Sequence, residues 1–123
     1  MQKLSLDALA RELLGRATDG RPGAGGGSRA AQTVVGGHEK VLRQTVIALA
    51  KDAALAEHAS PGEASLYVLR GRVTLTAGAE SWDGRDGDLL LLPDAPHSLT
   101  AHTDSVVLLT VARRPSHTET DSE

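Results

Sequence analysis

Hydrophobic and polar residues alternate with different spacings along the chain, and the spacing predicts where helices and strands lie. Near the amino terminus, Leu6, Leu9 and Leu13 recur every three or four residues, and Ser5 precedes them as a candidate N-cap. This pattern predicts a short amphipathic helix within residues 5–17. A helix of about three turns is marginal alone, so its leucine stripe must pack on the body of the protein or on a partner subunit.

Between residues 32 and 113 the apolar residues come in short runs separated by turn residues. The predicted strands lie at residues 33–35, 41–49, 66–69, 72–76, 89–92 and 106–111. Many short strands are typical of a β-sandwich or a β-barrel, and no helical segments alternate with them as an α/β fold requires. The runs 89–92 and 106–111 are apolar on both faces, which indicates strands that are covered on both sides.

Two segments lack any such pattern. Residues 18–31 are rich in glycine, and no Lys-Ser or Lys-Thr pair follows them, so we interpret this stretch as a flexible linker and not as a phosphate-binding loop. Residues 114–123 have no apolar anchor and are predicted to be a disordered tail. The predicted organisation is a helical segment 1–17, the linker 18–31, a β-domain 32–113 and the tail.

The composition narrows the classes of function. The chain has no Phe, and Tyr67 and Trp82 are its sole aromatic residues, which we interpret as packing residues in an aliphatic core. Two rings and a net charge of −3 argue against a nucleic-acid partner. The absence of cysteine excludes thiolate metal sites and cysteine nucleophiles. No secretion signal or membrane-length apolar run is present, so we expect a cytoplasmic protein without a membrane partner.

Two segments resemble the paired sequence motifs of the cupin family. Residues 57–71, EHASPGEASLYVLRG, share His58 and the final Gly71 with the first motif. Residues 87–97, GDLLLLPDAPH, share the leading Gly and the Pro with the second motif, and reach its histidine, His97, one residue early. The resemblance implies an all-β fold, a cupin-type double-stranded β-helix (jelly-roll) barrel with a short N-terminal helix. It also implies a homodimer, which the spare apolar strands favour.

The resemblance further implies a place for a metal. Cupins hold one divalent ion with three histidines and one glutamate, and in this chain only His58 and His97 occupy those positions. Ser60 stands at the second histidine position and Ala64 at the glutamate position. A divalent ion such as Mn, Fe, Ni or Zn needs about three protein ligands. Two histidines alone predict weak metal binding, or no metal, with Ser60 as a further polar group of the cavity.

A third ligand would have to come from another residue. Glu63 is one position away from the family glutamate, so strict alternation along a strand turns it away from the barrel interior unless the turn at Pro61 shifts the register. His102 follows His97 by five residues, and His38 lies early in the barrel region. These three side chains are the candidates.

Two functional hypotheses follow. The first is a small cupin that binds a small molecule or a weakly held divalent metal in its cavity, and the loss of two ligand positions favours it. The alternative is a metal-dependent cupin enzyme, a dioxygenase, isomerase or epimerase acting on a small organic acid or sugar. There His58 and His97 would hold a Lewis-acidic metal, and Glu63 or Glu57 would act as the base.

Overall fold

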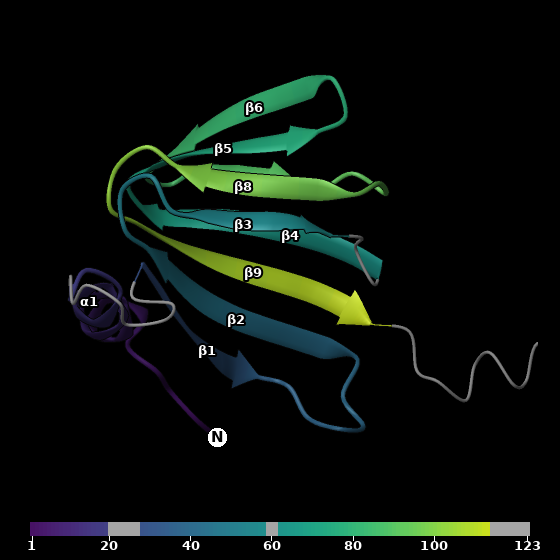
Figure 1. The fold of residues 1–123 in the computed structure, drawn as a ribbon. Helices are drawn as coiled ribbons and strands as arrows, with labels where there is room; N and C mark the ends of the chain where they lie inside the picture. Colours follow the sequence, from purple (N-terminus) through teal and green to yellow (C-terminus); the bar gives the residue numbers. More distant parts are fainter. Residues whose placement is uncertain (20–27, 59–61, 114–123) are drawn as a thin grey trace, which may run out of the picture.

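Two antiparallel β-sheets and one helix make up the fold (Figure 1). The computed structural model describes residues 1–19, 28–58 and 62–113. In chain order the elements are α1 (Leu6–Ala17), β1 (Arg29–Val35), β2 (Leu42–Leu49), β3 (Ala54–His58), β4 (Gly62–Arg70), β5 (Arg72–Ala77), β6 (Glu80–Arg85), β7 (Leu89–Leu91), β8 (His97–Ala101) and β9 (Ser105–Arg113). The five-stranded sheet has the order β1-β2-β9-β4-β7, and the four-stranded sheet has the order β3-β8-β5-β6. The predicted all-β fold with one N-terminal helix is confirmed.

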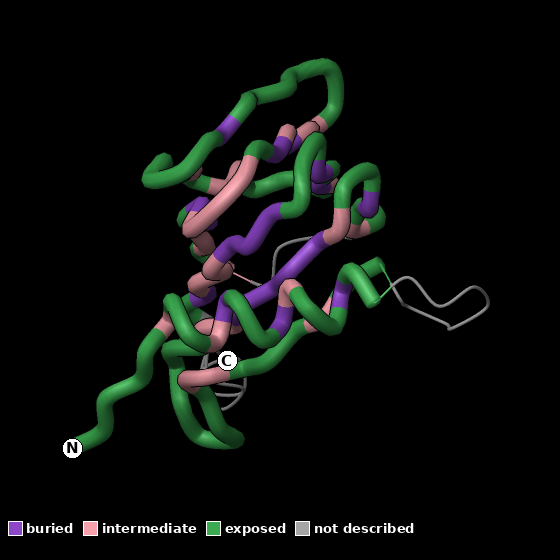
Figure 2. Tube along the Cα trace, turned by 90° about the vertical axis from the view of Figure 1, so that its left-hand side faces the viewer, coloured by how far each residue is buried: buried purple, intermediate pink, exposed green. Residues whose placement is uncertain are grey.

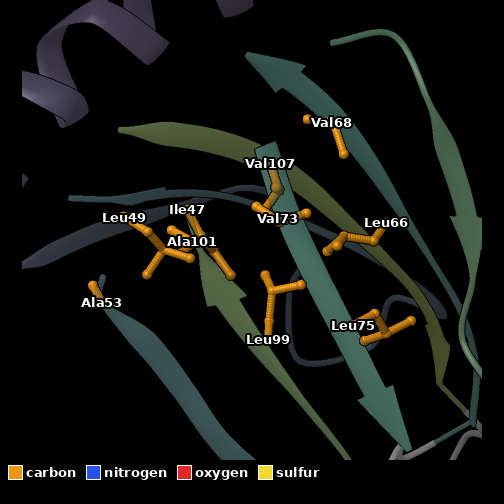
Figure 3. Close-up of a cluster of buried hydrophobic side chains, with 10 residues drawn as sticks. All are labelled: Ile47, Leu49, Ala53, Leu66, Val68, Val73, Leu75, Leu99, Ala101 and Val107. Atoms are coloured by element: carbon orange, nitrogen blue, oxygen red, sulfur yellow. The ribbon is translucent and has the colours of Figure 1, made fainter. Parts of the chain in front are cut away.

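The main core lies between the two sheets and is entirely aliphatic (Figure 3). Alternate residues of each strand point into it, as the period of two along a strand requires. Its buried members are Ile47, Leu49, Ala53, Leu66, Val68, Val73, Leu75, Leu99, Ala101 and Val107. The prediction that a chain without phenylalanine builds its core from Val, Leu, Ile and Ala is therefore confirmed.

Helix α1 packs on the outer face of the five-stranded sheet, where it lies over β1 and β2 (Figure 1). Ser5 caps the helix, with its Oγ accepting a hydrogen bond from the Ala8 amide at 3.1 Å. Leu13 is fully buried in a second cluster, against Val46, Ala48 and Val106. The leucine stripe thus packs on the chain's own sheet. Among the described residues, no helix is long and apolar enough to span a membrane.

Several element boundaries differ from those predicted. Three strands, β3, β6 and β8, were not predicted, because their short and partly polar sequences carry no clear alternation. Strand β6 is exposed at every position except Gly84 (Figure 2), and its pairing with β5 makes it a strand. Strand β1 begins at Arg29, within the predicted linker, since residues 29–33 pair with β2 in continuous register. The rest of the linker, residues 20–27, and the predicted tail lie outside the described residues.

Candidate functional site

His97 is the one buried histidine among the described side chains. It begins β8 and is 5% exposed, and it shares the inward face of this strand with Leu99 and Ala101. Its Nδ1 lies 3.0 Å from the carbonyl oxygen of Ala95. A carbonyl can only accept a hydrogen bond, so Nδ1 carries the proton, and in the neutral ring Nε2 carries the lone pair. This is the arrangement that orients a histidine for ligation or for accepting a hydrogen bond.

The backbone of His58 lies directly opposite that of His97. The two residues are partners in the antiparallel pairing of β3 with β8, after a shift of register between Leu55 and His58. The two histidines selected from the sequence are therefore brought side by side in the sheet. The side chain of His58, and the whole of Ser60, lie outside the described residues.

The structure does not place Glu63 or His38, two of the candidates for a third metal ligand, on the inward face beside His97. Strand β4 pairs with β9 without a shift from Gly62 to Val68, so Ala64 occupies the inward register and Glu63 the exposed outward one. His38 is exposed in the turn between β1 and β2. In the described ranges, no group of three or more His, Cys, Asp or Glu side chains is arranged to hold a metal ion.

His102 belongs to a different cluster, on the outer face of the four-stranded sheet. Its Nε2 is hydrogen-bonded to Thr74 Oγ1, which in turn donates to Asp83 Oδ1 at 2.7 Å. Arg72 Nη2 lies 3.0 Å from Asp83 Oδ2. The hydrogen bond from Thr74, followed by that from Arg72, lowers the pKa of the Asp83 carboxyl. This exposed network ties β5, β6 and the turn after β8 together and is separate from the interior face that bears His97.

Further polar side chains stand near the same end of the barrel as His97. Ile47 and Leu49 of β2 face the core, so alternation places Thr45 and Arg43 on the same face, toward the end where β2 begins. Strand β2 has apolar residues on both faces, because α1 covers its outer side, so the sequence showed no alternation that would have selected Arg43.

A small hollow lies on the rim of the same end. Its lining residues are Leu75, Ala77, Glu80, Trp82 and Pro93, and its volume of about 10 Å³ has room for about one water molecule. Trp82 is 45% exposed, so it is a rim residue and not the packing residue that we expected.

No family model and no curated protein matches the chain. Solved structures do match it, and three of them are described here. A conserved protein of unknown function from Streptococcus pyogenes, SPY1581, is 29% identical with a TM-score of 0.64, over 70% of this chain and 75% of that one. A cupin superfamily protein from Desulfitobacterium hafniense is 14% identical with the same TM-score of 0.64, over 70% of this chain and 78% of its own.

A larger protein shares the same fold. Salicylate 1,2-dioxygenase from Pseudoaminobacter salicylatoxidans is 22% identical with a TM-score of 0.69, and the match covers 87% of this chain and 31% of the dioxygenase. The chain has two facing antiparallel sheets, and this architecture is consistent with the structural similarity to these proteins. The chain therefore has the fold of a small cupin domain.

Proposed function

We propose that this cupin domain binds a small molecule, or a weakly held divalent metal, at the end of the barrel where β8 begins, with His97 as the anchoring side chain. The burial of His97 on the inward face, together with the bond from its Nδ1 to the Ala95 carbonyl, is the observation that carries the proposal. The hydrogen bond to the Ala95 carbonyl fixes the orientation of the imidazole ring, and with it the direction of both ring nitrogens.

The described residues do not fit a tightly bound metal. His97 contributes one imidazole, and His58 is included in the proposal because its backbone pairs with that of His97 between β3 and β8. Two imidazoles leave a divalent ion short of the usual three protein ligands, so water or the ligand itself would complete its coordination. We therefore assign metal binding at this site a low affinity and derive no chemical step from it.

Polar groups on the inward face of β2, at the same end of the barrel, support an anionic small molecule. Arg43 and Thr45 stand on the inward face of β2 toward the same end of the barrel, and the core beneath them is aliphatic. A small organic acid would place its carboxylate near these groups and its carbon skeleton against the Leu and Val side chains.

The alternative, a metal-dependent enzyme, has less support. It requires a third protein ligand beside the two histidines, and the candidates Glu63 and His102 both lie on exposed outward faces. The similarity to salicylate 1,2-dioxygenase, at 22% identity, concerns the fold.

Titration calorimetry on untagged protein tests the proposal, with Ni²⁺ and a panel of small hydroxy acids as probes, since the hydroxyl group of such an acid can donate a hydrogen bond to Nε2 of His97. We expect His97→Ala to weaken the binding of each probe that the wild type binds by at least about tenfold, since one anchoring contact is worth that much. His102→Ala is the matched control, because it removes an exposed imidazole, and it should bind as the wild type does. Absence of binding by the wild type, or equal binding by the His97→Ala variant, would contradict the proposal.

A further inference from the structure

The small hollow beside Trp82 combines a charged side chain with an aromatic one. Five residues line it: Leu75, Ala77, Glu80, Trp82 and Pro93. Among these five, Glu80 carries the one charge and Trp82 the one aromatic ring, and both side chains are exposed. His97 is not part of the lining. We call this feature the rim hollow.

The pairing of β6 with β5 determines where the two side chains point. Trp82 pairs with Leu75, and Glu80 pairs with Ala77, in an unbroken register. Leu75 belongs to the main core, so Trp82 and Glu80 share the inward face of the four-stranded sheet. Gly84, the next residue on this face of β6, is buried. The inward face of β6 therefore runs from the core at Gly84 to the rim at Glu80.

The part of the chain that carries the rim hollow is acidic. Residues 73–112 contain one Arg and no Lys, against six acidic residues: Glu80, Asp83, Asp86, Asp88, Asp94 and Asp104. Asp94 directly follows the lining residue Pro93. In the ranges that the structure describes, no basic side chain forms an ion pair with Glu80. A surface of this charge raises the local concentration of cations.

We propose that the rim hollow binds the ammonium group of a small primary alkylamine. The carboxylate of Glu80 pairs with the positive charge, and the indole ring of Trp82 attracts the same charge. The volume of the hollow, about 10 Å³, holds about one water molecule, and an NH₃⁺ group is of similar size. Guanidinium and quaternary ammonium groups are larger. The apolar remainder of the lining suits the methylene groups next to the nitrogen.

The lining argues against other ligands that bind beside a tryptophan. A sugar needs a hydrogen-bonding partner for each of several hydroxyl groups, whereas Glu80 and the indole N–H of Trp82 are the two hydrogen-bonding side-chain groups in the lining. A carboxylate would be repelled by Glu80 and Asp94. The ligand of the rim hollow therefore differs in charge from the organic acid proposed to bind at His97.

Trp82 is the sole tryptophan of the chain, so tryptophan fluorescence reports on the rim hollow directly. At neutral pH and constant ionic strength, we expect millimolar butylammonium to cause a saturable change in this emission. Butanol, which is uncharged, and tetramethylammonium, which is larger than the hollow, should cause none.

Glu80→Gln should weaken butylammonium binding about fivefold, the upper range for an exposed ion pair. Glu63→Gln is the matched control, because it removes the same charge from the exposed outward face of β4, and it should bind as the wild type does. Trp82→Leu removes the fluorophore together with the ring, so its binding is followed by the NMR signals of the ligand. It should be weakened about threefold, as expected for an exposed cation–π contact.

Circular dichroism verifies the fold of each variant. The proposal would be overturned by a wild type that shows no saturable binding, by butanol binding as well as butylammonium, or by a folded Glu80→Gln or Trp82→Leu variant with wild-type affinity. Because His97 does not line the rim hollow, His97→Ala should retain butylammonium binding. This test can therefore fail or succeed whether or not a ligand binds at His97.

Discussion

The backbone at Gly71 determines how β4 turns into β5. Gly71 has φ +101°, and a Cβ at this position would overlap Ser105 Oγ and lie 2.7 Å from the Asp104 carbonyl oxygen. Ser105 is fully buried, and its hydroxyl accepts a hydrogen bond from the Arg72 amide at 3.1 Å and donates one to the Thr103 carbonyl at 2.7 Å. A side chain at residue 71 would therefore collide with the start of β9.

Gly71→Ala should lower the free energy of unfolding by about 3 kcal/mol or more, because it combines an unfavourable φ with a clash against backbone atoms. Gly78→Ala is the control: Gly78 has φ +61°, and a Cβ there would have no neighbouring atom within 4 Å, so this variant should lose only about 1 kcal/mol. Urea denaturation measures both values. Equal losses in the two variants would show that the contact with Ser105 does not matter.

At the candidate site, the sequence predicted the orientation of a residue correctly where that orientation depends only on alternation along the residue's own strand. The position of His97 after the GDLLLLP segment selected it, and the structure places it on the inward face. Alternation alone indicated that Glu63 turns outward. By contrast, the interaction of His102 with Thr74 depends on the packing of the turn after β8 against β5, which no local pattern records. Arg43 was missed for the same reason, since burial by α1 hides the alternation in β2.

At the scale of the elements, amphipathicity predicted α1 but not the surface on which it packs. The helix lies on the outer face of the five-stranded sheet, which explains why β2 and β9 are apolar on both sides. The polar strand β6 could not be predicted, because an edge strand with one face in solvent needs few apolar residues. Its identity as a strand follows from its pairing with β5, a contact between segments.

Leu13→Ala tests how strongly α1 contributes to stability. Leu13 is 0% exposed between the helix and the sheet, so the truncation should cost about 2–5 kcal/mol of unfolding free energy. Leu4→Ala, at a residue that is 54% exposed, should change stability little. Thermal and denaturant unfolding followed by circular dichroism provide the measurement. If both variants unfold like the wild type, the docking of α1 adds nothing to the fold.

At the scale of the whole molecule, the two sheets enclose a core that aliphatic side chains fill (Figure 3). The ligand site that we propose therefore lies at the end of the barrel, near His97, and not in its centre. The small body leaves Leu89 and Leu91 exposed on the edge strand β7, and small domains bury a limited fraction of their surface.

The central claim, that Nε2 of His97 is the binding atom of this domain, can be measured directly by nitrogen-15 NMR of the histidine side chains. The account predicts that His97 holds its proton on Nδ1, and that its Nε2 resonance shifts or broadens first when Ni²⁺ is added, before those of His38 and His102. A proton on Nε2 of His97, or a His97 resonance that stays unchanged while His102 responds, would contradict it.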